Sequence, residues 1–177
     1  MKTKFLGCSQ VVAAFATVLT LGGGTAQAVT CNVPADRATI QLAVNDVTCD
    51  PIKVAPGVYA ENVMIPRSLT LNGAQAGFAV AGRVFGDPLT ESTVTGVFAT
   101  PLPDITIQAR GVTVDGFSLT NPGQSTGILI KTAGDSAFIT NNIIEDIGGA
   151  AFSDNTQAIY LENGPDNVSI LNNDMKN

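Results

Sequence analysis

A short phrase that recurs in the second half of the chain constrains the fold more than any other feature. Each copy is a run of alternating apolar and polar residues, then a two-residue turn, then a second short run. The copies span residues 112–119, 137–144 and 168–175, and residues 69–73 hold an earlier copy of the turn. Alternation with a period of two is typical of half-buried strands. The turns contain Asn-Gly, Asp-Gly or Asn-Asn, which adopt a positive φ at low steric cost, so each unit reads as strand, tight turn and strand.

A second phrase precedes each copy and begins at Ile105, Ile128 and Ile159, so the repeats are 23 and 31 residues apart. Strands at such a period, with no room for helical crossovers, are typical of a solenoid in which like phrases stack on like phrases. Stacking would give one continuous core of Ile, Val and Leu. Antiparallel hairpins and a β-sandwich of short strands are the alternatives. Because the phrases match in order as well as in type, we favour the solenoid.

The N-terminal half carries related phrases at residues 39–44, 52–63 and 68–73. On these phrases and the later repeats, the chain resembles the right-handed parallel β-helix proteins of the pectin-lyase-like superfamily. The resemblance covers most of the chain and implies an all-β fold, a right-handed parallel β-helix with a short N-terminal capping helix. That superfamily includes lyases, hydrolases, esterases, epimerases and coils without known catalysis. The resemblance therefore implies a fold and not one activity.

The coils of the β-helix are predicted to occupy residues 52–177. We expect the first coil to contain residues 52–54, 63–65, 69–71 and 92–95. Residues 74–91 then form a Gly-rich insertion that contains Arg83, Asp87 and Glu91. Long loops on rigid scaffolds often carry function, but we interpret this one as a solvated decoration. The chain stops inside the third copy of the phrase, which predicts a β-helix truncated at its C-terminus.

Residues 1–28 have the order of a bacterial Sec-type signal peptide. A basic start is followed by an apolar stretch and by Ala26-Gln27-Ala28, a small-residue site that predicts cleavage after Ala28. The apolar stretch is too short for a comfortable membrane span. The sequence therefore predicts a secreted or cell-surface protein that is free of the membrane after signal cleavage.

Residues 29–51 are predicted to form an N-terminal cap. Ile40, Ala43 and Val44 recur at helical spacing within residues 38–45, and Asp36 or Thr39 is suited to begin the helix. We expect this short helix to cover the open end of the first coil, because a terminal coil exposes core and strand edge. Cys31 and Cys49 remain after signal cleavage and are predicted to form a disulfide in an oxidising compartment.

Charge and residue types exclude several classes of function. The chain has 15 acidic and 9 basic residues and a formal net charge of −6, which signal cleavage makes more negative by removing Lys2 and Lys4. Nucleic-acid binding needs clustered basic residues, so an acidic chain without such clusters is not expected to bind nucleic acid. The sequence contains no His, which excludes Ser-His-Asp hydrolysis and most zinc sites. No metal site or cofactor is predicted, and a Ca²⁺ requirement has no support in the sequence.

Stacked strands place outward residues in columns. If Ile105, Ile128 and Ile159 point inward, then Thr106 and Tyr160 face outward with Met64 and Leu129. The residues predicted to bind substrate on this face are Asp104, Thr106, Gln108, Lys131, Tyr160 and Glu162. Lys131 and Glu162 would be neighbours on adjacent strands, and we interpret them as a solvent-exposed ion pair. Asn141 and Asn172 are predicted to form a structural asparagine ladder at the turn.

These features predict a secreted β-helix protein that binds or processes an extracellular polysaccharide. No complete catalytic set is visible in the sequence, so an enzyme, whether a polysaccharide lyase or a glycoside hydrolase, would need catalytic residues outside this stretch. The alternative is a non-catalytic structural or adhesive cell-surface module.

Overall fold

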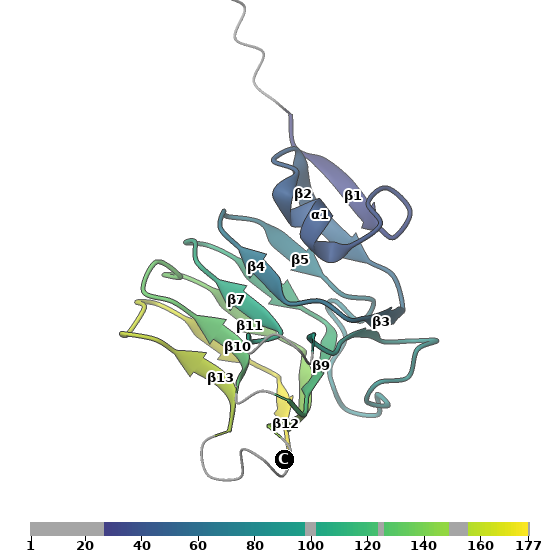
Figure 1. Ribbon diagram of the computed structural model, residues 1–177, viewed down its shortest axis with the longest axis vertical. Coiled ribbons are helices and arrows are strands. Elements are labelled where there is room, and N and C mark those ends of the chain that lie inside the picture. Colours follow the sequence, from purple (N-terminus) through teal and green to yellow (C-terminus); the bar gives the residue numbers. More distant parts are fainter. Residues whose placement is uncertain (1–26, 98–101, 124–125, 149–155, 177) are drawn as a thin grey trace, which may run out of the picture.

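The computed structural model describes residues 27–97, 102–123, 126–148 and 156–176 (Figure 1). The predicted signal peptide falls almost wholly within residues 1–26, outside the described residues. The described strands form three sheets, and their pairings are parallel. This result confirms the parallel β architecture and shows that the antiparallel hairpin alternative is wrong.

The first sheet has the order β1-β2-β5-β8-β11-β14, the second β13-β10-β7-β4 and the third β15-β12-β9-β6-β3. The first sheet contains β1 (Val29–Val33), β2 (Cys49–Val54), β5 (Thr70–Asn72), β8 (Thr113–Asp115), β11 (Phe138–Thr140) and β14 (Ser169–Leu171). The second contains β4 (Val63–Ile65), β7 (Ile105–Ile107), β10 (Thr126–Ile130) and β13 (Gln157–Leu161). The third contains β3 (Gly57–Tyr59), β6 (Ser92–Val94), β9 (Phe117–Asn121), β12 (Ile143–Ile147) and β15 (Asp174–Met175).

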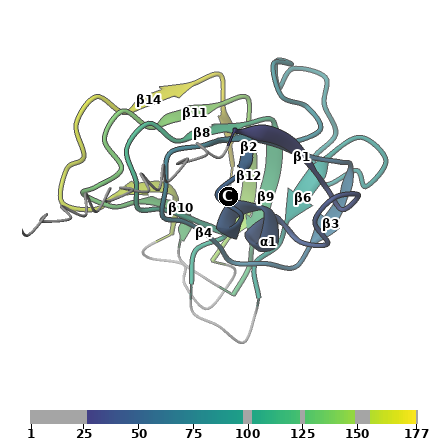
Figure 2. The ribbon, with the colours of Figure 1, turned by 90° about the horizontal axis from the view of Figure 1, so that it is seen from above.

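The chain passes from the first sheet to the third, then to the second, and returns to the first. We call three such consecutive strands a tier; β8, β9 and β10 form one. In the view from above, β8, β11 and β14 lie along one side, β4 and β10 along the opposite side, and β6, β9 and β12 along a third (Figure 2). This stacking of tiers is compatible with a parallel β-helix.

The repeated phrases lie in register. Ile105 pairs with Val63 and Ile128, and Ile128 pairs with Ile159. In the first sheet, Val114 pairs with Leu71 and Ile139, as the phrases predict. The side chains that these columns point inward form most of the core, including Ile65, Leu71, Ile105, Ile107, Val114, Leu119, Ile128, Ile130 and Ile139.

The composition of the first coil differs from the prediction. Ile52 pairs with Leu71, so these two residues belong to successive tiers and not to one. The first full tier is β2, β3 and β4, and its third-sheet strand is Gly57–Tyr59, which the predicted first coil does not include. Ser92–Val94 belongs to the second tier, because it stacks directly on Gly57–Tyr59.

An asparagine ladder is present at the turn between the first and third sheets, but it is formed by Asn142 and Asn173. The Phe117 N–H donates to Asn142 Oδ1 at 3.0 Å, and the Asn142 N–H donates to Asn173 Oδ1 at 2.9 Å. Each amide nitrogen also donates back to a backbone carbonyl of the preceding tier, Asn142 to Val114 and Asn173 to Ile139.

The prediction that Asn141 and Asn172 form the ladder was therefore one residue out of place. Both adopt a positive φ, 52° and 54°, in the column that Gly116 occupies one tier earlier. Their role is to close the turn, since Asn tolerates this conformation better than most residues with a side chain.

The predicted short helix is α1 (Ile40–Asn45), and Thr39 is its N-cap: the Leu42 N–H donates to Thr39 Oγ1 at 3.1 Å. Ile40, Ala43 and Val44 are buried as predicted, and the helix packs against β1, β2 and β4. The described residues contain no helix with the length and hydropathy needed to cross a membrane.

Two charged residues on either side of β4 fix the ends of α1. Both Glu61 carboxylate oxygens accept N–H groups at the start of the helix, from Ile40 at 3.0 Å and Gln41 at 2.9 Å. At the other end, the Arg67 guanidinium donates to the carbonyls of Val44 and Asp46, and it also donates to the carbonyl of Cys49 at the start of β2. Backbone groups at helix ends lack intrahelical partners, so these contacts satisfy them. The Cys31–Cys49 disulfide joins β1 to β2 nearby, with a Cα–Cα distance of 5.2 Å, as predicted.

We expect Asn142→Ala to lower the free energy of unfolding by about 3 kcal/mol, because it leaves the buried Phe117 N–H without its acceptor and removes the side-chain bonds from Asn142 to Val114 and Asn173. Urea unfolding followed by circular dichroism measures this. Asn45→Ala is the control: Asn45 is exposed and accepts one hydrogen bond, from Gln41, so the change should stay within about 0.5 kcal/mol. Equal effects of the two substitutions would show that the ladder does not stabilise the stack.

Candidate functional site

The face predicted to bind substrate is the outer side of the second sheet. Register brings Met64, Thr106, Leu129 and Tyr160 into one column across β4, β7, β10 and β13, as the sequence predicts. Tyr160 is 41% exposed and Met64 is 43% exposed, whereas Thr106 is only 7% exposed. The column is therefore open at its two ends and covered at Thr106.

A second column follows at the end of the same strands. The backbone N–H groups of Gln108, Lys131 and Glu162 donate to Ile65, Ile107 and Ile130, each one tier earlier, at 2.8–2.9 Å. The Lys131 ammonium lies 3.5 Å from the Glu162 carboxylate, and both side chains are more than one third exposed. These two columns together are called the second-sheet face below. They bring together five of the six predicted substrate-binding residues, all except Asp104, although Thr106 is buried within its column.

Asp104 is not part of that surface, because it is completely buried. It lies at the corner between the third and second sheets. Asn121 Nδ2 donates to its Oδ1 at 2.8 Å, while its Oδ2 has no hydrogen-bond partner. Burial raises the pKa of Asp104 to about 8, and the Asn121 hydrogen bond only partly opposes this shift. The alternating pattern places Asp104 next to the inward-facing Ile105 and therefore predicts an outward side chain for Asp104. It does not show that other segments of the same chain cover this corner.

The second-sheet face does not hold a pair of carboxylates. Its two columns contain one carboxylate, Glu162, whereas glycoside hydrolysis uses two on either side of the scissile bond. The described part of the chain also contains no cluster of three His, Cys, Asp or Glu residues that could hold a metal. What remains is an aromatic ring, an amide and an ion pair on a rigid surface.

The insertion of residues 74–91 is held against the stack by a buried ion pair. Arg83 and Glu91 lie 2.6 Å apart, and their side chains are 7% and 0% exposed. Arg83 also donates to the Asn141 carbonyl, and the Ser118 hydroxyl donates to Glu91 at 3.0 Å. Breaking a buried pair of this kind is costly. The insertion is thus a fixed wall beside the tiers, more ordered than the solvated decoration that we expected.

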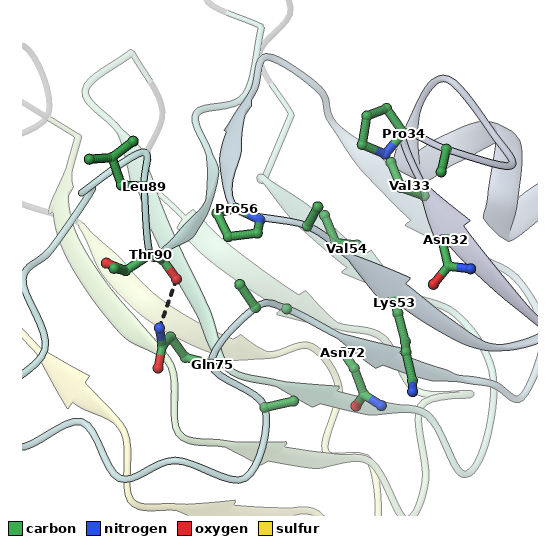
Figure 3. A pocket seen from close by; sticks show the side chains of 15 residues that line it. Asn32, Val33, Pro34, Lys53, Val54, Pro56, Asn72, Gln75, Leu89 and Thr90 are labelled. Carbon is green, nitrogen blue, oxygen red and sulfur yellow. Dashed lines mark hydrogen bonds between the residues drawn. The ribbon is translucent and has the colours of Figure 1, made fainter.

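This wall bounds a groove at the turn between the first and third sheets (Figure 3). The groove has a volume of about 660 Å³. We call it the Lys53 groove; it is lined by Asn32, Val33, Pro34, Ala35, Lys53, Val54, Ala55, Pro56, Asn72, Gly73, Ala74, Gln75, Ala76, Leu89 and Thr90. No sequence pattern predicted this groove, because its walls come from four separate segments of the chain.

Comparisons of the chain with protein-family models, with curated proteins and with solved structures gave no match. The pectin-lyase-like resemblance therefore still depends on the repeated phrases and the stacked parallel sheets.

We expect stability to fall as the pH rises from about 4 to about 8, because folded Asp104 keeps a proton that the unfolded chain releases near pH 3.8. The slope from this one group is at most about 1.4 kcal/mol per pH unit. Asp104→Asn keeps an oxygen for Asn121 and removes the titration. Urea unfolding at pH 5 and pH 7.5 should show a smaller loss of stability for the variant than for the wild type. An identical loss in both proteins would contradict the burial of an ionisable Asp104.

Proposed function

We propose that this protein is a secreted or cell-surface right-handed parallel β-helix of the pectin-lyase-like kind, and that its second-sheet face binds an extracellular polysaccharide. Three observations support the fold: every third strand stacks in parallel register, α1 packs its buried side against the N-terminal strands, and a disulfide secures them. In this proposal α1 acts as the cap of the first tier. The signal-like residues 1–28 and the disulfide support export.

The observation that carries the binding proposal is the pair of in-register columns on the second-sheet face. Adjacent parallel strands are about 4.8 Å apart, so the columns repeat on the scale of a sugar ring. The exposed ring of Tyr160 can stack on the apolar face of a sugar. Gln108, Lys131 and Glu162 offer donors and acceptors to hydroxyl groups along the same line. A polymer lying across the strands would meet a new set of contacts at each tier.

The groups on this face favour binding over turnover. The chain has no His, and the two columns contain one carboxylate. Any processing activity would need catalytic residues outside this stretch of sequence. If the face binds no polymer, the structural or adhesive module becomes the better account of the same stack of tiers.

The test is binding of residues 29–177 to a panel of neutral and acidic polysaccharides by affinity electrophoresis and calorimetry. We expect one polymer class to bind and Tyr160→Ala to weaken it about tenfold, since a stacked aromatic ring contributes about 1–1.5 kcal/mol. Phe78→Ala is the matched control, because Phe78 is an aromatic residue that is 64% exposed in the insertion. A panel without binding, or equal losses in the two variants, would count against the second-sheet face.

A further inference from the structure

We propose that the Lys53 groove is a second binding site, and that its ligand is a small hydroxylated monocarboxylate such as a sugar acid. This site lies on the first sheet and its turn, and it shares no residue with the second-sheet face. The volume of about 660 Å³ falls in the range of small-molecule sites.

The charge of the groove comes from Lys53, which stands in the middle of an outward row. Register places Asn32 on one side of Lys53 and Asn72 on the other. Figure 3 shows the Lys53 and Asn72 side chains extending in the same direction from adjacent strands. Within the described part of the chain, no carboxylate lies within ion-pair distance of the Lys53 ammonium. In a chain of net charge −6, an unpaired cation inside a groove is a specific position for an anion.

Two carboxylates beside this row, Asp36 next to Asn32 and Asp115 in register with Asn72, are already hydrogen-bonded. Asp36 accepts hydrogen bonds from the Asn32 backbone N–H at 2.7 Å and from Asn32 Nδ2 at 2.8 Å. Asp115 accepts from the Gly77 N–H at 3.0 Å and from Asn141 Nδ2 at 2.8 Å. These contacts direct both carboxylates toward neutral N–H donors, and neither carboxylate forms an ion pair with Lys53.

The remaining lining suits the body of a sugar. Gln75 Nε2 donates to the Thr90 carbonyl at 2.7 Å, which directs the side chain and leaves Oε1 for a ligand hydroxyl (Figure 3). The Asn72 amide can donate and accept beside Lys53. Pro34, Pro56 and Leu89, which is 83% exposed, provide apolar surface for the C–H face of a ring. A neutral sugar would leave Lys53 unused, and an apolar acid would leave the amides unused.

The groove has a single cationic side chain, and this favours a carboxylate ligand over a phosphate. Lys53 is the only charged residue in the lining, so the site offers one positive charge. Phosphate sites in proteins combine Arg forks, several cations or a helix N-terminus, and the lining residues supply none of these. The groove therefore matches a single negative charge. Its walls are set before binding, because the buried Arg83–Glu91 pair holds the insertion, and a preorganised site loses less entropy on binding.

The experiment titrates the protein with D-glucuronate, glucose, acetate and inorganic phosphate, followed by isothermal calorimetry and amide chemical shifts. We expect glucuronate to bind at least tenfold more tightly than each of the other three, with shifts at Lys53, Asn72 and Gln75. Lys53→Met should weaken glucuronate about tenfold or more. Lys53 is exposed, so the variant should fold, and thermal melting checks this.

Two control variants separate this site from the second-sheet face. Lys131→Met removes a cation from that face, and Tyr160→Ala removes its aromatic ring; neither should change glucuronate binding in the groove. If Lys53→Met binds glucuronate as tightly as the wild type, or if Lys131→Met weakens it equally, the proposal is overturned. Equal affinity for acetate or phosphate would reduce the groove to a non-selective anion site and would also overturn it. Loss of polysaccharide binding in Tyr160→Ala tests only the proposed function.

Discussion

The structure depends on the parallel hydrogen-bond ladder between successive tiers. A parallel strand that slips by one residue would turn its whole apolar set outward, so the register of Ile105 on Val63 and of Ile128 on Ile105 determines both the core and the surface. The dry column of isoleucine, valine and leucine and the outward column from Met64 to Tyr160 follow from this register. The asparagine ladder of Asn142 and Asn173 holds the same register at the turn, where two strands change direction.

Polar side chains from distant segments hold α1 and the insertion, which lie outside the hydrogen-bond ladder of the tiers. Glu61 and Arg67 satisfy the two ends of α1, and the Arg83–Glu91 pair holds the insertion beside the third sheet. The second-sheet face is a repeated surface that we propose binds a polymer, and the Lys53 groove is a concave site that we propose binds a small ligand. Their separation lets each be altered without the other.

The sequence predicted what depends on repetition and missed what depends on contacts between distant segments. The pairing of Ile128 with Ile159, the disulfide and the Thr39 cap were all predictable from periodicity or local chemistry. The residues of the asparagine ladder were predicted one position too early. Asn141 and Asn142 have the same side chain, and only the backbone φ distinguishes the turn residue from the ladder residue. The burial of Asp104 and the Lys53 groove depend on segments that approach through folding, and no local pattern signals either of them.

The most direct test of the account is detection of the backbone hydrogen bonds between tiers by NMR, through scalar couplings that cross the bond from amide nitrogen to carbonyl carbon. The structure predicts a correlation between the Lys131 amide and the Ile107 carbonyl, and another between the Glu162 amide and the Ile130 carbonyl. Observing both would establish the in-register parallel stack on which the two proposed binding surfaces depend. Correlations that join these amides to carbonyls of an antiparallel neighbour, or to a register shifted by one residue, would contradict it.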